Sequence, residues 1–357
     1  MRIKKGIVAS AKIGLPIAIV ILIMIVPFGV SSEREAHAFL RRYFNFSATE
    51  FNALDRGEVI TRLPPVPDSR EVAVLGAVRV NVSKDIFVAR IRDIANFKRS
   101  SNVLEIGRFG KTPKLDDLRG LTIDEDDINA LRECRVGDCG VKLSAAWIDR
   151  LQKGIDWNAP DYQIRPSTMI KQMLVEYAQG YLAGGNARLG VYQDKEYAHK
   201  VADDVVSLLR QTQYIYNYAP DFLRYLEQFP QSKPAGVEDF IYWSREKFGL
   251  KPVISLTHIS IYRKSRTGGT DLFIASKQLY ASHYFESSLV FTYFLDDTQN
   301  SREPAAYLIY LNRSRADGLR GRFSDAKRRL IAGELRDGME KNLNILKERL
   351  SGPRRSI

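Results

Sequence analysis

The sequence lacks the short motifs that identify the commonest enzyme classes. It has no Gly-x-Ser-x-Gly nucleophile elbow, no His-Glu-x-x-His zinc motif, no P-loop and no dinucleotide-binding glycine pattern in the setting that each requires. We therefore expect no cofactor and no metal. An enzymatic role stays open, but the sequence disfavours it.

Cysteine is almost absent, since Cys134 and Cys139 are the only two in 357 residues. Their spacing is not Cys-x-x-Cys and no histidine follows, so redox and haem-attachment sites are disfavoured. In an oxidising compartment the pair predicts a local disulfide around Gly137, with free thiols as the alternative. So small a loop stabilises weakly, at the low end of about 2–4 kcal/mol.

Charge is missing from one long stretch, Ile13 to Val30, which holds 18 uncharged and mostly aliphatic residues. As a helix it would span about 27 Å, close to the hydrocarbon thickness of a bilayer. Cations precede it, so the positive-inside rule keeps the N-terminus in the cytoplasm. We expect an inner-membrane anchor with the body in the periplasm. The alternative is a signal peptide cleaved near Ala36-His37-Ala38, with the body secreted to the periplasm.

The remaining chain is moderately basic. The formal net charge is +12, but Arg2, Lys4, Lys5 and Lys12 precede the apolar stretch. Without these four cations, 50 basic and 42 acidic residues leave a net charge of +8. This favours an anionic lipid surface as partner. It does not indicate nucleic acid, because acidic residues are interspersed. No oligomeric state is predicted.

Hydrophobic periodicity predicts an α+β fold. Period-two or β-branched runs predict strands at 72–82, 103–109, 253–262, 272–281, 288–295 and 306–311. Helical spacing predicts a helix over 35–54, a helix capped by Ser83, and a long C-terminal helix over 324–350. The expected parts are a signal anchor or signal peptide (1–32), a helix and linker (33–67), the first part of the α+β domain (68–123), an all-helical insertion (124–235), an antiparallel meander with the C-terminal helix (236–350), and a disordered tail (351–357).

Two resemblances follow from these patterns. The order strand, helix, strand, meander and long helix resembles the helix-grip layout of START-like domains, which implies a hydrophobic cavity between sheet and C-terminal helix. Four stretches are also similar to those of an uncharacterised family of exported, membrane-anchored bacterial proteins, a resemblance that implies no activity. They are 134–143 (CRVGDCGVKL), 251–255 (KPVIS), Ser276-Lys277-Gln278 with His283-Tyr284, and 312–315 (NRSR).

Five polar residues stand out as candidate ligand contacts. Alternation places His258 on one face of its strand, and Lys277 with His283 on one face of the next. Polar groups interrupting an apolar wall are typical of ligand cavities. Arg313 and Arg315 begin a basic connection to the final helix and suit anionic oxygens. Ordinary structural hydrogen bonds are the alternative for the first three, and bracing of the loop for the two arginines.

These observations support three hypotheses. The leading one is a membrane-anchored periplasmic protein that binds or transfers an apolar or amphipathic, lipid-like ligand between the sheet and the final helix. Its polar contacts would be His258, Lys277 and His283, with Arg313 and Arg315 meeting an anionic group. The second is a cell-envelope enzyme with His258 and His283 as acid and base. The third is an envelope scaffold whose helical stretch contacts a partner.

Overall fold

The computed structural model describes residues 35–160, 162–266, 269–297, 304–321 and 324–351. They belong to one compact unit, Arg34–Ile357. The segment predicted as a signal anchor and the predicted C-terminal tail lie outside the described residues, apart from Ser351. None of the described helices is both long and apolar enough to cross a bilayer.

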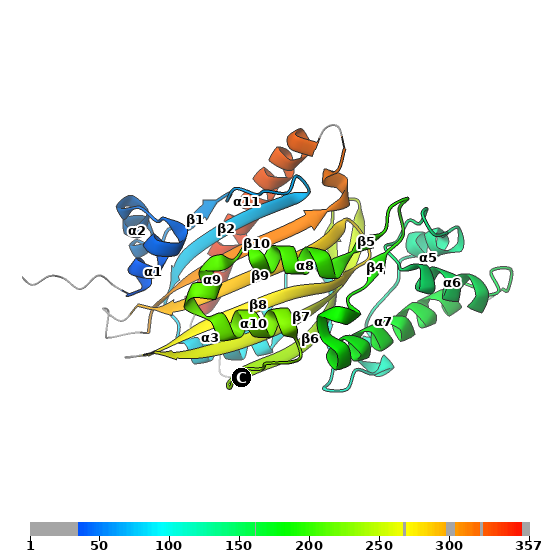
Figure 1. The fold of residues 1–357 in the computed structure, drawn as a ribbon, viewed down its shortest axis with the longest axis horizontal. Helices are drawn as coiled ribbons and strands as arrows, with labels where there is room; N and C mark the ends of the chain where they lie inside the picture. The colour runs from blue at the N-terminus through cyan, green and yellow to red at the C-terminus, as the bar shows by residue number, and fades with distance from the viewer. Residues whose placement is uncertain (1–34, 161, 267–268, 298–303, 322–323, 352–357) are drawn as a thin grey trace, which may run out of the picture. The chain divides into compact units, whose positions relative to one another are not determined.

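A single large antiparallel sheet organises this unit (Figure 1). Its eight strands lie in the order β1-β2-β10-β9-β8-β7-β6-β3, and every neighbouring pair is antiparallel. The predicted α+β class, with a large antiparallel sheet and a C-terminal helix, is therefore confirmed. The strands are β1 (Ile60–Arg62), β2 (Glu71–Val80), β3 (Val103–Arg108), β6 (Val237–Phe248), β7 (Lys251–Arg266), β8 (Gly269–Ala281), β9 (Phe285–Asp296) and β10 (Ala306–Ala316).

The sheet separates two hydrophobic cores, because successive side chains of a strand point to opposite faces. Phe273 and Tyr293 belong to the core on one face, which we call the helical-layer face. Ile274 and Phe294 belong to the core on the other, which we call the α11 face. Alternation alone thus assigns each strand residue to one of two environments.

Helices from the middle of the chain cover the helical-layer face. Figure 1 shows α8, α9 and α10 lying across it, with α7 beside its lower right part. Helices α1 (Glu35–Phe44) and α2 (Ala48–Asp55) add Phe39, Leu40 and Phe51 to the same core. The layer consists of α5 (Glu125–Arg132), α6 (Ala145–Gly154), α7 (Ile164–Gly184), α8 (Val201–Arg210), α9 (Gln213–Tyr218) and α10 (Pro220–Gln228), with a small β4–β5 pair (Val191–Tyr192, His199–Lys200).

The C-terminal helix α11 (Ser324–Ser351) lies on the opposite face, against β2. Gly76 of β2 permits its close approach: a Cβ at this position would lie 2.5 Å from Leu343 Cδ1 and 2.8 Å from Met339 Cγ. Helices α3 (Lys84–Arg92) and α4 (Ile94–Phe97) share this face. Phe87 of α3 stacks on Phe294, and Ser83 caps α3 as expected.

Four local features differ from the sequence-based expectations. The stretch 124–235, predicted to be all-helical, contains the short β4–β5 pair. The helix expected over 35–54 is two helices, because Asn45 adopts a left-handed conformation and Ser47 starts α2 with a capping box. A short strand, β1, lies in the expected linker. Strand β6 was missed: its run Phe240–Trp243 is apolar without alternation, because both of its faces are buried.

The structure contains the expected disulfide between Cys134 and Cys139, with an S–S distance of 2.00 Å. The enclosed turn has Gly137 at φ 90°, which favours glycine. Backbone hydrogen bonds run from Gly137 to Gln193 and from Cys139 to Asp194. The loop is therefore attached to the residues that follow β4.

We expect the C-terminal half of α11, rather than its start, to anchor the helix. Leu343→Ala should lower the free energy of unfolding by about 2–4 kcal/mol, because the side chain is 3% exposed in the core. Leu330→Ala, on the same helix but 66% exposed, is the matched control and should change it by less than about 0.5 kcal/mol. Urea denaturation measures both, and equal losses would contradict this packing.

Candidate functional site

All five predicted ligand contacts lie on the helical-layer side of the sheet. His258 of β7 and Lys277 of β8 are directly paired in register, and both are 1% exposed. Arg313 and Arg315 of β10 share the face of Leu311, a residue of the same core. His283 follows β8 and contacts α5. The expectation that these residues line a space between the sheet and α11 is therefore wrong, because alternation points them away from that helix.

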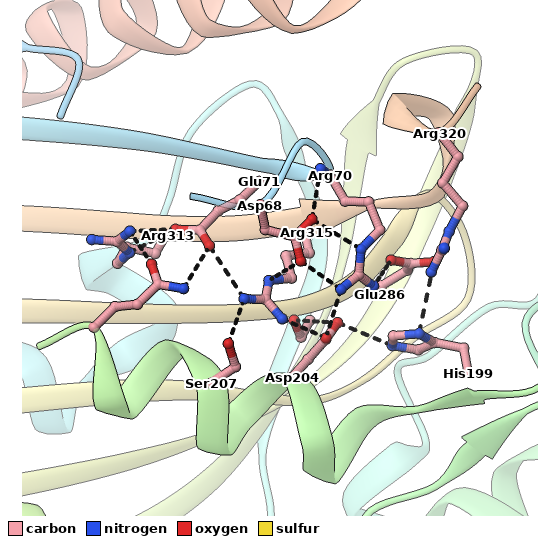
Figure 2. Close-up of polar contacts among 12 residues, drawn as sticks. Asp68, Arg70, Glu71, His199, Asp204, Ser207, Glu286, Arg313, Arg315 and Arg320 are labelled. Carbon is pink, nitrogen blue, oxygen red and sulfur yellow. Dashed lines mark hydrogen bonds and ion pairs between the residues drawn. The ribbon is translucent and has the colours of Figure 1, made fainter. Parts of the chain in front are cut away.

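Arg313 and Arg315 are bound by the protein's own carboxylates (Figure 2). Arg313 Nε donates to Glu71 Oε1 at 2.7 Å, and the same guanidinium contacts Gln211. Arg315 Nη1 lies 2.6 Å from Asp204 Oδ1 of α8. Its Nη2 donates to Ser207 Oγ at 2.7 Å. The guanidinium groups therefore hold α8 to the sheet instead of facing an open space.

The same network continues to Glu286 of β9. Arg70 Nη1 lies 2.9 Å from Glu286 Oε2, and Arg320 Nη2 lies 2.7 Å from Glu286 Oε1. Arg70 also reaches Asp204 at 3.3 Å. The four cations Arg70, Arg313, Arg315 and Arg320 thus match the four anions Asp68, Glu71, Asp204 and Glu286. We call these eight residues the buried ionic network.

Three groups in this region have the spacing of a metal site. Ligand atoms of His199, Asp204 and Glu286 lie within 4.8 Å of one another. Burial alone would raise the pKa of Asp204, but the adjacent imidazole of His199 and the charge of Arg315 hold it well below its usual range. His199 Nε2 lies 3.2 Å from Asp204 Oδ2, at an angle outside that of a regular hydrogen bond. Because guanidinium groups already neutralise both carboxylates, a divalent ion would have to displace them.

Lys277 lies in a separate polar cluster under α7. Its Nζ donates to Asn186 Oδ1 at 2.5 Å and sits over the rings of Tyr181 and Phe229, at 5.1 and 5.3 Å from the centroids. Among the described residues it has no carboxylate within ion-pair distance. Burial therefore lowers its pKa to about 7, although the charge of Asp239 opposes this.

The orientation of Asn186 is fixed by its own donors. Its Nδ2 donates to the carbonyls of Leu226 and Glu227 at the end of α10, so Oδ1 must face Lys277. Gly185 precedes it at φ 61°, and a Cβ there would collide with the carbonyl of Phe229. The backbone thus requires glycine where the turn after α7 meets the end of α10.

His258 joins Tyr181 to Asp239. Its Nδ1 lies 2.9 Å from Tyr181 Oη and its Nε2 lies 3.1 Å from Asp239 Oδ1. Burial lowers the pKa of His258, so the ring is neutral at pH 7. Burial alone would raise the pKa of Asp239, but the hydrogen bond from His258 reverses this, so the carboxylate is charged. His258 then carries its proton on Nε2 and accepts from Tyr181 on Nδ1, so both ring nitrogens are engaged.

His283 pairs with Asp127 of α5 at 3.0 Å. Asp127 is also one wall of a cavity of about 10 Å³ between α5, α7 and the sheet, which is about the space of one water molecule. Its other lining residues are apolar except for Tyr280 and Ser282. His258 and His283 therefore each have their own carboxylate partner, Asp239 and Asp127.

A set of residues on the α11 face, which we call the polar strip, was not among the ligand contacts predicted from the sequence. It consists of Ser255 and Thr257 of β7, Ser276 and Gln278 of β8, Ser288 and Thr292 of β9, and Tyr310, Asn312 and Ser314 of β10. The register joins them across the sheet, for example Thr257 to Gln278 and Tyr310 to Thr292. The signal was present in the sequence as uncharged polar residues at alternate positions of four strands.

The polar strip carries hydrogen-bonding groups with few partners. Ser314 Oγ bonds to Ser288 and Asn312, but in the described part of the chain the side chains of Thr257, Gln278 and Tyr310 have no hydrogen bond. Gln278 and Tyr310 are half-buried and reach solvent. Burial raises the pKa of Tyr310 to about 12. None of the nine residues is charged, although 27% of the residues in the chain are.

Charged and apolar groups flank the polar strip. On the β6 side, Lys98 Nζ lies 2.6 Å from Glu246 Oε1. On the β2 side, α11 packs over Gly76, which pairs with Tyr310 in register.

Comparison of the chain with protein-family models, curated proteins and solved structures finds no match.

Arg315→Met tests the buried ionic network. It leaves Asp204 and Glu71 buried with one cation fewer, and should lower the free energy of unfolding by about 3–5 kcal/mol. The control Arg119→Met removes an exposed pair with Asp116 and should change it by at most about 1 kcal/mol. Denaturation curves at pH 7 measure both, and a loss for Arg315→Met no greater than the control's would contradict the role of the network.

Lys277→Met tests the buried amine. The folded-state pKa of about 7 lies below the ordinary value of 10.5, so the folded state releases the proton first. The stability of the native chain relative to the variant should therefore rise between about pH 7 and pH 10, by about 1.4 kcal/mol for each unit of pKa difference as an upper limit. Denaturation at several pH values measures this difference. The exposed control, Lys247→Met, should show no such rise, and a flat difference for Lys277→Met would exclude the assigned environment.

Proposed function

We propose that this protein is a membrane-anchored envelope protein whose body, in the periplasm, binds an amphipathic ligand on the α11 face of its sheet. The apolar segment 13–30 would be the anchor, and the preceding cations would keep the N-terminus in the cytoplasm. The disulfide between Cys134 and Cys139 is compatible with an oxidising compartment.

The polar strip is the observation that carries this proposal. It offers hydroxyl and amide groups without hydrogen bonds in the middle of a sheet, where a ligand can bind several strands at once. Polar groups with no partner gain most from a ligand that supplies one. The short side chains of Ser and Thr also lose little conformational entropy on binding.

The chemistry of the polar strip favours a ligand head group that is uncharged and bears hydroxyls, such as a sugar. A phosphate or carboxylate would require cations, and Arg313 and Arg315 are on the other face and already paired. The half-buried Met339 and Leu346 of α11 lie on the same face of the sheet and would contact an apolar tail. A neutral glycolipid has both parts.

The position of α11 supports a helix-grip-like arrangement in this proposal. Its C-terminal half packs on β2 through Leu343 and Leu350, and the polar strip lies beyond β2 on the same face. In this reading the helices α5–α10 are an insertion that closes the other face. The ligand site would then lie between the sheet and the C-terminal helix, with different contacts from those predicted by the sequence.

Binding of a neutral glycolipid tests the proposal. The full chain in detergent should retain monoglucosyl diacylglycerol in native mass spectrometry, in preference to phosphatidylglycerol. Ser276→Arg and Asn312→Arg should each lower retention roughly tenfold, because they place a bulky charge in the polar strip. The matched control Thr168→Arg, on the exposed side of α7, should retain the lipid like the native chain. Equal retention by all variants, or none by the native chain, would refute the site.

A further inference from the structure

The first helix begins close to the end of the apolar segment. Four residues separate Val30 from Glu35, where α1 starts, and the five residue steps between the two span at most about 18 Å when fully extended. If segment 13–30 is in the bilayer, as proposed above, α1 must lie within reach of the membrane surface. The start of α1 would then lie no more than about 18 Å from the end of the anchor.

Aromatic and cationic side chains gather at this helix. Phe39 of α1 packs edge-on against Tyr218 of α9, with centroids 4.8 Å apart. Tyr43 of α1 contacts the same Tyr218 ring at 6.0 Å. Arg42 lies over Tyr43 at 5.5 Å, and Lys264 of β7 lies over Tyr218 at 4.1 Å. Three separate elements thus contribute to one cluster.

We call Tyr43, Tyr218, Arg41, Arg42 and Lys264 the interfacial belt. Arg41 and Arg42 are exposed, while Tyr43, Tyr218 and Lys264 are half-buried. Tyr216 of the same short helix α9 is 61% exposed. Tyrosines with basic residues are the composition of membrane–water interfaces, where the ring is partly apolar and the cation meets phosphate.

Acidic residues near the belt are already engaged. Glu50 of α2 pairs with Arg62, and this contact lowers its pKa to about 2 against the opposing effect of burial. Glu58 pairs with Arg56. Arg42 of α1 is exposed and, in the described part of the chain, contacts the ring of Tyr43 and no carboxylate, so its charge faces the surroundings. Charge complementarity then selects an anionic surface.

We infer that the interfacial belt rests on the bilayer and contacts anionic lipid head groups. This inference depends on the proposed anchor, but it concerns a different face from the ligand site. It also fixes the orientation of the body: α1, α9 and the Lys264 end of β7 face the membrane. The β6–β7 turn at Leu250, 14 residues from Lys264 along an extended strand, lies about 45 Å away and faces the aqueous phase.

Lipid quenching tests the orientation with the full chain. Single-cysteine variants Arg42→Cys and Lys264→Cys, and the control Leu250→Cys, each carry a fluorophore in nanodiscs that contain phosphatidylglycerol and brominated phosphatidylcholine. The native cysteines are joined in a disulfide and do not react. We expect bromine to quench the labels at 42 and 264 roughly twofold and to leave the label at 250 unchanged. Equal quenching at all three positions would overturn the inference.

Charge reversal separates the belt from the anchor. Arg41→Glu with Arg42→Glu should reduce quenching of a label at position 264 in nanodiscs with phosphatidylglycerol but not in those without it. Lys247→Glu, an exposed control near Leu250, should have no effect. A chain that does not incorporate into nanodiscs would refute the proposed anchor. A chain that incorporates but shows no quenching at 42 and 264 would refute the belt alone.

Discussion

The pairing of four guanidinium groups with four carboxylates between α8 and the sheet determines how the rest of the body is arranged. A buried charge is tolerated only when it is matched, and here each cation contacts an anion from another part of the chain. Arg313 and Glu71 are separated by 242 residues. The helical layer is therefore held at a defined position, and this closes one face of the sheet.

The two faces of the sheet consequently differ in chemistry. On the helical-layer face, nearly every polar group has a partner, including both ring nitrogens of His258. Lys277 is the exception, because its amino group contacts an amide and two aromatic rings instead of a carboxylate. On the α11 face, six of the nine polar-strip residues are half-buried and the other three, Thr257, Thr292 and Ser314, are buried. Charged groups that are paired within the protein, as on the helical-layer face, stabilise the packing of the layers. Neutral polar groups with few partners, as on the α11 face, are available to hydrogen-bond a ligand.

Alternation assigned His258 and Lys277 each to one face of its own strand, because period two is a property of the strand itself, and the register of β7 with β8 brings these two faces together. It could not predict which helices cover that face, since this depends on contacts over long sequence separations. The partners of Arg313 and Arg315 illustrate the same limit, because Glu71 and Asp204 lie far away in the chain. Strand β6 and the capping box at Ser47 do have local sequence signals, namely the apolar run within β6 and the Ser47–Glu50 spacing, but neither was predicted. The polar strip has a sequence pattern of alternate uncharged polar residues, but a ligand site is more readily predicted from ionisable residues such as His258 and Lys277.

The direction of β10 has a consequence for how a lipid would be handled. The strand begins beside α1, where His37 contacts Tyr307, and Asn312 follows five residues later. At about 3.3 Å per residue, the polar strip lies roughly 17 Å farther from α1 along this strand. With α1 at the bilayer surface, a head group at Asn312 would stand well above its neighbours in the leaflet. In the proposed function, such a geometry would raise the ligand partly out of the membrane, which is the first step of transfer to an acceptor in the aqueous phase.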